Sequence, residues 1–204
     1  MPNSESNFIR TILLLSACFA LSVSTSSLTV STSSLVGYEI AGNKALATLP
    51  LSFHLLGTML AGIPASLLMK RVGRRYGFMI GTGIGVSGAV AAALSIIYSS
   101  FMFFCMSMFL LGILIGFSQL YRFTAVEVAN RKFRSKAISL VMFGGIIAGF
   151  IGPTVAAQAK DLIADAPFAG SYLFIIMLHI LVFTVLFMIR LPQPSVEELT
   201  GESR

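Results

Sequence analysis

The sequence predicts an all-α membrane protein, a bundle of six transmembrane helices with both termini in the cytoplasm. Composition predicts the class, because 56% of the 204 residues are hydrophobic and only 11% are charged, whereas a soluble domain carries roughly a quarter charged residues. Continuous apolar runs predict helices, since barrel strands would alternate over about ten residues. The distribution of Lys and Arg between the loops predicts the orientation.

Six apolar segments are long enough to cross the roughly 30 Å hydrocarbon core, which takes about 20 helical residues. They lie near residues 8–36, 47–69, 76–98, 101–123, 137–157 and 170–189. Arg10 before the first segment could mark a secretory signal peptide, but further spans follow closely, so we expect a first span. The spans form one domain over residues 1–190, and residues 191–204 form a polar cytoplasmic tail.

Basic residues gather in alternate loops. The loop after the second span holds Lys70, Arg71, Arg74 and Arg75, and the loop after the fourth holds Arg131, Lys132, Arg134 and Lys136. The loops after the first and fifth spans offer only Lys44 and Lys160. Because basic loops stay in the cytoplasm, both termini are predicted to be cytoplasmic. This topology accounts for the charges without a nucleic-acid partner.

The glycines predict helix packing rather than a nucleotide site. Gly83, Gly85 and Gly88 fit G-x-G-x-x-G, but the pattern needs a preceding strand and a nearby acid, and none lies between Glu39 and Glu127. Glycines spaced by four lie on one helix face and let helices approach closely. We expect this role for Gly77, Gly81 and Gly85, for Gly112 and Gly116, and for Gly145 and Gly149.

The first span carries a repeated hydroxyl pattern. "STSSL" begins at Ser24 and again at Ser31, a displacement close to two helical turns. Ser24, Ser27, Ser31 and Ser34 therefore form one stripe. Its hydroxyls either bond back to carbonyls of their own helix or line a water-filled cavity.

Five further polar residues are candidate solute contacts. Gln119, Tyr121 and Arg122 lie at the inner end of the fourth span. Ionisable groups within spans are functional candidates by default, although Arg122 could instead reach the lipid headgroups as an anchor. His54 and His179 are either proton carriers or buried neutral side chains bonded to a hydroxyl or carbonyl. No metal-ligand motif or cofactor site is predicted, and no paired acid and base suggests an enzyme.

Three motifs resemble the major facilitator superfamily. "SLLMKRVGRRYGF" is similar to the family's loop G-x-x-x-D-R-x-G-R-R. The matching residues are Arg71, Gly73, Arg74 and Arg75, and the departures are Ser66 for Gly and Lys70 for Asp. "EVANRKFRSKAISL" is similar to the stretch joining the fourth and fifth helices, with Glu127 and Arg134 in place, and "GGIIAGFIGP" resembles the Gly-Pro helix motif, with Gly152 and Pro153 in place.

The resemblance implies a half-length secondary transporter built from two three-helix inverted repeats. Family members usually have twelve helices in two halves, with the substrate between the halves. The chain resembles an N-terminal half, and residues 191–204 resemble the start of the central linker. The expected partners are a small solute, membrane lipid and a second six-helix half, as a homodimer, a separate chain or a missing C-terminal half. The expected location is a bacterial inner membrane.

The resemblance also implies a cytoplasmic gating loop, in which Arg74 pairs with Glu127 as a latch. The alternative is a local helix pair between Glu127 and Arg131, worth about 0.2–0.5 kcal/mol. Lys70 stands where the family has Asp, so the attraction between that acid and the neighbouring charges of the family's loop is missing here. We therefore do not expect the family's full set of charge interactions in this chain. Two functions stay open: a transporter, or a non-transporting subunit that acts as a scaffold or assembly element of a larger complex.

Overall fold

The structure is a computed structural model that describes residues 2–159, 162–163, 167–189 and 191. Over these residues it is all-helical, and six helices are long and apolar enough to cross a membrane, so the predicted fold class is confirmed. The helices are α1 (Pro2–Ile40), η1 (Lys44–Leu46), α2 (Leu49–Val72), α3 (Arg74–Ile97), α4 (Phe101–Ser118), α5 (Tyr121–Val128), α6 (Arg134–Ala159) and α7 (Ala169–Met188). The predicted tail beyond Leu191 lies outside the described residues, and the orientation of the termini stays a prediction.

The fourth span consists of two helices, α4 and α5, rather than the single helix that the sequence predicts. The amide of Leu120 donates to the carbonyl of Phe117 at 3.1 Å, a bond that tightens the last turn of α4. The hydroxyl of Ser118 donates to the carbonyl of Ile115 at 2.8 Å, and such bonds back to the main chain bend helices. The break contains no proline.

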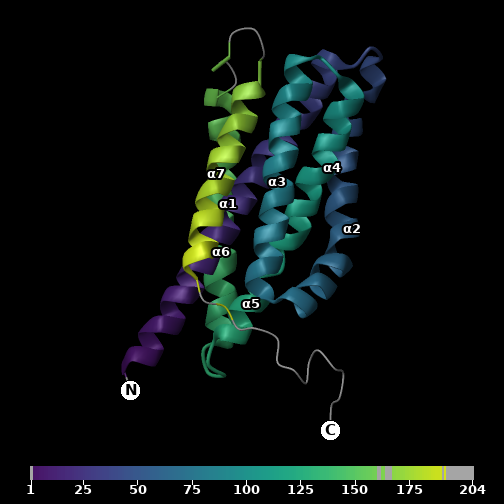
Figure 1. The fold of residues 1–204 in the computed structure, drawn as a ribbon. Helices are drawn as coiled ribbons and strands as arrows, with labels where there is room; N and C mark the ends of the chain where they lie inside the picture. The colour runs from purple at the N-terminus through teal and green to yellow at the C-terminus, as the bar shows by residue number, and fades with distance from the viewer. Residues whose placement is uncertain (1, 160–161, 164–166, 190, 192–204) are drawn as a thin grey trace.

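Four helices form a row in the order α6, α1, α4 and α2, and α3 and α7 cover one side of it (Figure 1). No helix of the described chain covers the opposite side, which we call the open side. Within the bundle, α1 and α4 are flanked by α6 and α2 and covered by α3 and α7. We take the side chains exposed in the middle of α1, Val30, Ser31 and Leu35, to face the open side.

Close approach of backbones holds the row together at two parallel seams. In the α2–α4 seam, a Cβ on Gly57 or on Gly112 would overlap a main-chain carbonyl of the other helix. In the α1–α6 seam, a Cβ on Gly152 would lie 2.6 Å from the carbonyl oxygen of Ser24. Each seam joins the first helix of one three-helix repeat to the second helix of the other. The two seams therefore correspond under an inverted repeat.

Glycines of α3 face neighbouring side chains. A Cβ on Gly81 would lie 2.6 Å from the ring of Phe117, and one on Gly85 would lie 2.5 Å from Leu114. A Cβ on Gly83 would meet nothing within 4 Å. The face with the four-residue spacing thus packs against other helices, while the extra glycine of the G-x-G-x-x-G pattern points to open space.

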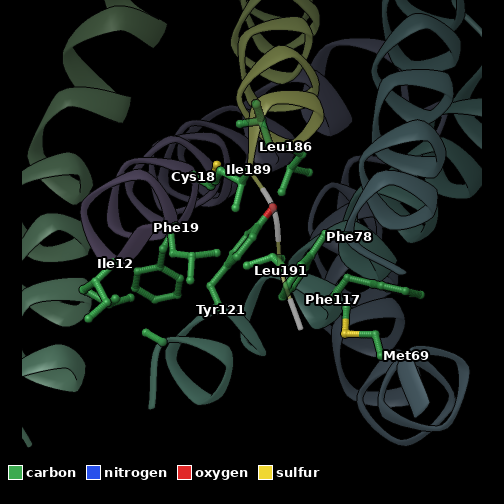
Figure 2. Packing of buried hydrophobic residues seen from close by; sticks show 14 of the residues in the cluster. Ile12, Cys18, Phe19, Met69, Phe78, Phe117, Tyr121, Leu186, Ile189 and Leu191 are labelled. Carbon is green, nitrogen blue, oxygen red and sulfur yellow. The ribbon is translucent and has the colours of Figure 1, made fainter. Parts of the chain in front are cut away.

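The apolar interior forms two clusters, one toward each end of the bundle. We call the end where α2 meets α3 and α5 meets α6 the basic end, since both loops are rich in Lys and Arg. In the cluster at this end, the ring of Tyr121 lies between side chains of several helices (Figure 2). It stacks on Phe78 with ring centroids 4.0 Å apart. This packing fixes the position of α5 beneath α3 and α1.

Candidate functional site

A single glycine makes the sharp turn at the basic end. α2 ends at Val72, and Gly73 has φ 88° and ψ 157°, a conformation that side chains disfavour. α3 begins at the next residue, Arg74. With only one residue between two helices, Arg74 and Arg75 occupy the first turn of α3 and point to different neighbours.

Arg74 joins α3 to α5. Its Nε donates to Oε2 of Glu127 at 3.0 Å, and its Nη2 contacts Oε1 of the same carboxylate. The contact is therefore bidentate, the geometry that fits a guanidinium to a carboxylate best. The side chains are 22% and 44% exposed, respectively, so water screens the pair and its contribution is about 0.2–1 kcal/mol.

Arg75 joins α3 to the end of α7. Its Nε donates to the carbonyl of Leu186 at 3.1 Å and its Nη2 to the carbonyl of Phe187 at 2.5 Å. Its guanidinium also lies 5.2 Å from the centroid of the Phe187 ring. The last carbonyls of a helix have no partner within the helix, and a cation is favourable there. Arg75 thus caps α7, a role that sequence reasoning missed because the acceptors are backbone atoms.

The other basic residues predicted for the gating loop take no part in these contacts. Lys70 and Arg71 lie in the last turn of α2 and are exposed, and Arg134 is exposed at the start of α6. The predicted loop therefore divides into a pinned part, formed by Arg74 and Arg75, and a solvated part.

The serine stripe of α1 divides between a helix seam and the open side. The hydroxyls of Ser24 and Ser27 donate to two carbonyls of α6 at 3.0 and 2.8 Å. Ser31 donates to a carbonyl of its own helix at 2.8 Å and is exposed, and Ser34 is half-buried. The stripe therefore serves close packing in its first half and reaches the open side in its second half.

A second row of hydroxyls on α1 points into the bundle, and sequence reasoning missed it. Thr25, Thr29, Thr32 and Ser33 are at most 1% exposed. The hydroxyl of Thr32 lies 3.2 Å from that of Tyr172 on α7. Among the described residues, the hydroxyls of Thr29 and Ser33 have no hydrogen-bond partner. The sequence shows Ser and Thr on both faces of α1. Because the two faces are similarly hydropathic, the sequence does not reveal which face packs inside the bundle.

Both histidines lie inside the bundle. His54 is 1% exposed in the α2–α4 seam, and His179 is 0% exposed on α7, with Nδ1 3.0 Å from the carbonyl of Ile175. In the described part of the chain, His54 Nδ1 and His179 Nε2 have no partner. Neither side chain reaches the open side in this structure, so solute contact or proton transfer by either one stays a prediction.

The three polar residues near the α4–α5 break differ in exposure. Tyr121 is buried in the cluster of Figure 2, whereas Gln119 and Arg122 are partly exposed. The guanidinium of Arg122 lies 5.1 Å from the ring centroid of Phe123. Its Nε is buried and has no hydrogen-bond partner within the described ranges. A solute or a headgroup could therefore bind Arg122 only through the terminal nitrogens of its partly exposed guanidinium.

The polar groups that are exposed or partly exposed near α1 and the α4–α5 break are the hydroxyls of Ser31 and Ser34, the amide of Gln119 and the guanidinium of Arg122. The described residues contain no group of three His, Cys, Asp or Glu that could hold a metal ion. Cys18 and Cys105 are buried free thiols. The arrangement can therefore form hydrogen bonds with a polar solute.

Fold and site together define an integral multi-pass membrane protein of the transporter class. It has one open side and, at the basic end, two arginines that join α3 to α5 and to α7, Arg74 and Arg75, which we call the arginine clamp. The family model of the Major Facilitator Superfamily matches residues 12–204. The chain belongs to the Major Facilitator Superfamily.

Bacterial transporters are among its relatives. The chain is 38% identical over 184 residues to riboflavin transporter RfnT of Brucella anthropi, covering 90% of this chain and 46% of that protein. It is 27% identical over 177 residues to YdeG, an uncharacterized MFS-type transporter of Bacillus subtilis, covering 85% and 41%. The chain thus spans about half the length of the curated relatives it matches. Its named relatives are transporters rather than enzymes, and their bacterial origin suggests an inner membrane.

Solved structures share the fold. An autoinhibited peptide transporter of the POT family superposes with a TM-score of 0.70 at 16% identity, over 91% of this chain and 39% of that one. The fucose:proton symporter FucP of E. coli superposes with a TM-score of 0.68 at 18% identity, over 91% and 50%. At these identities the similarity establishes the fold alone.

Proposed function

We propose that the chain is a six-helix half of a secondary transporter that moves a small solute by alternating access against a second six-helix half. The polar lining of the open side carries the proposal. Ser31 is exposed there, and Ser34, Gln119 and Arg122 are partly exposed. Polar and ionisable side chains within a membrane face protein or water rather than hydrocarbon. These polar groups lie among exposed apolar side chains such as Val30 and Leu35 of α1, and we propose that this mixed face borders a solute path.

The helices at the ends of the row support a second half. Met59 and Ile63 of α2 are 81% and 75% exposed, and Phe150 of α6 is 77% exposed. α2 and α6 lie on either side of α1 and α4. A second half seated on both flanks would leave the polar lining as a cavity between the halves. The second half is a second copy, a separate chain or a further part of the same protein.

The arginine clamp supports a rocking motion. Arg75 ties α3 to α7 through main-chain carbonyls, whereas the partly exposed pair of Arg74 and Glu127 is weak enough to break. We infer that the contacts of Arg75 persist when the halves move, and that the Arg74–Glu127 ion pair forms and breaks as the latch between conformations. The basic end is the cytoplasmic end in this proposal, and exposed Lys70 adds no attraction to the latch.

The proposed solute class is riboflavin or a similar planar heteroaromatic molecule with a polyol chain. Identity of 38% to a riboflavin transporter over 90% of the chain supports this class. The hydroxyls of Ser31 and Ser34 and the amide of Gln119 can exchange hydrogen bonds with a polyol. Arg122 is partly exposed, and the terminal nitrogens of a guanidinium can donate to ring carbonyl oxygens.

Riboflavin uptake by cells that carry the gene at its own locus tests the proposal, since any second half is then present. We expect saturable uptake that disappears on deletion and returns on complementation. The Gln119→Leu variant removes the amide at similar volume and should raise the KM of uptake. The control Ser87→Ala removes an exposed hydroxyl of α3, away from the open side, and should leave uptake unchanged.

Uptake of riboflavin that does not change on deletion would contradict the proposed solute. Absence of flux for a panel of flavins, sugars and organic acids, together with stoichiometric copurification of a membrane partner, would contradict transport itself. The chain would then be a scaffold subunit that keeps the fold.

A further inference from the structure

The proline of α6 leaves one main-chain carbonyl without its helical donor. Pro153 lies inside α6 (Arg134–Ala159). A proline has no N–H, so the carbonyl of the residue four positions earlier, Gly149, loses its hydrogen bond, and the ring also pushes that carbonyl aside. In a membrane, such a freed carbonyl needs a partner from a neighbouring helix or from water.

Ser27 of α1 supplies that partner. Its hydroxyl donates to the carbonyl of Gly149 at 2.8 Å. The neighbouring carbonyl of Ala148 accepts from Ser24 at 3.0 Å. Both bonds cross from α1 to α6, and they lie just before the proline.

Gly152 makes the approach possible. A Cβ at this position would lie 2.8 Å from the Cβ of Ser27 and 2.6 Å from the carbonyl oxygen of Ser24. Both contacts are too close for a side chain, so α1 and α6 can touch only because a glycine precedes the proline. The adjacent Gly152 and Pro153 therefore act together: one removes a side chain and the other frees an acceptor.

The hydroxyls of α1 bond either within their own helix or across to α6. Ser22, Thr25 and Ser31 donate to carbonyls four residues earlier in α1, at 3.0, 3.2 and 2.8 Å. This is the usual local bond of Ser and Thr in a helix. The hydroxyls of Ser16, Ser24 and Ser27 donate to carbonyls of α6 instead. Of these three, Ser27 is the one that reaches the carbonyl that Pro153 frees.

We propose that Ser27 is a positioning residue that replaces the missing N–H of Pro153 and locks α1 to α6 at the proline. The lock joins the first helix of one repeat to the second helix of the other, so that α1 and α6 move as one unit. The proposal concerns the folded chain and does not depend on which solute, if any, the protein transports.

A double-mutant cycle between Ser27 and Pro153 tests the lock. Unfolding of the purified full chain is followed by SDS titration in mixed micelles. Ser27→Ala leaves a buried carbonyl without a donor, and we expect the ratio of unfolded to folded protein to rise roughly tenfold. Pro153→Ala restores an N–H to Gly149, so adding Ser27→Ala to that variant should change the ratio by less than about twofold. A coupling of this size exceeds that of independent sites.

Two control backgrounds separate the lock from general effects. Pro64 of α2 is also inside a helix, so Pro64→Ala restores an N–H elsewhere, and Ser27→Ala should keep its full effect there. Ser31→Ala removes an exposed hydroxyl bonded within its own helix and should be nearly silent. Ser27→Thr retains the donor and should behave as the native chain.

The outcomes that would overturn the lock are definite. Ser27→Ala with the same effect in the native and Pro153→Ala backgrounds would show that the hydroxyl does not serve the freed carbonyl. If the single variant fails to accumulate in the membrane, the lock requires that Pro153→Ala restore its accumulation. Failure of that rescue, while Pro153→Ala alone accumulates, would equally refute the proposal.

Discussion

Gly112 gives the sharpest prediction about the packing of the bundle. A Cβ at Gly112 would overlap the carbonyl oxygen of His54 and lie 2.9 Å from its carbon and 3.0 Å from the amide nitrogen of Thr58. All three are backbone atoms of α2, so the Gly112→Ala variant can be accommodated only if α2 and α4 separate. Gly62 of α2, the helix that Gly112 of α4 contacts, is the matched control, because a Cβ there would meet nothing within 4 Å.

The two substitutions should have opposite signs. Overpacking costs about 1–3 kcal/mol, and the helical preference for Ala over Gly offsets roughly 1 kcal/mol of it. Because the new Cβ would meet backbone atoms, which cannot move aside, we take the overpacking cost as about 3 kcal/mol. Subtracting the offset of about 1 kcal/mol leaves Gly112→Ala less stable than the native chain by about 2 kcal/mol. Gly62→Ala should gain up to about 1 kcal/mol.

Thermal unfolding in detergent measures both effects. At about 2–4 °C per kcal/mol for a chain of this size, the Tm of Gly112→Ala should fall by about 4–8 °C, and that of Gly62→Ala should stay or rise by a few degrees. Equal effects of the two substitutions, or a stabilised Gly112→Ala variant, would refute the proposed contact between the α2 and α4 backbones.

Three other predictions follow from hydrogen bonds across the bundle. A double-mutant cycle of Arg74→Ala and Glu127→Ala should give a coupling of about 0.2–1 kcal/mol in detergent unfolding, and additive effects would exclude the ion pair. Arg75→Ala should cost about 1 kcal/mol and speed amide exchange in the last turn of α7, with Arg75→Lys in between because an ammonium cannot fork to two carbonyls; unchanged exchange would contradict the cap. Thr32→Ala should destabilise the protein more than Tyr172→Phe. The Thr32→Ala variant leaves the buried hydroxyl of Tyr172 with only the sulfur of Met108, 3.9 Å away, whereas in the Tyr172→Phe variant Thr32 keeps its bond to its own helix at 2.9 Å. The reverse order of stability in unfolding would contradict this account.

The membrane class, the six spans and the family motifs could be predicted from the sequence because each depends on local composition. Runs of apolar residues and loops with four cations stay recognisable without knowledge of the partner helix. The Arg74–Glu127 ion pair was implied by the motifs that contain both residues, and the pair is present. Its role as a latch stays a prediction.

Contacts to backbone atoms could not be predicted. Arg75 reaches carbonyls 111 and 112 residues away, and every residue except proline offers the same N–H and C=O groups, so no side chain marks the acceptor. The faces of α1 were ambiguous for a related reason. Ser24 and Thr25 are similarly polar. Ser24 lies in the α1–α6 seam and Thr25 in the interior because of where α6 and α7 pack, and the sequence of α1 does not show this. The break between α4 and α5 has no proline to mark it in the sequence. The bond of Ser118 to a main-chain carbonyl does not mark it either, because Ser22 and Ser107 make such bonds inside unbroken helices.

Water access to the open side tests the central claim most directly. The two native cysteines are buried, so a Ser31→Cys variant in native membranes introduces one exposed thiol on the open side, and Leu181→Cys places the control thiol on the exposed face of α7. If the open side lines a solute path, a charged, membrane-impermeant thiol reagent should label Ser31→Cys, riboflavin should slow that labelling, and Leu181→Cys should stay unlabelled. Failure to label Ser31→Cys with the charged reagent, together with rapid labelling by a lipophilic one, would show that lipid covers the open side and would contradict the transporter account.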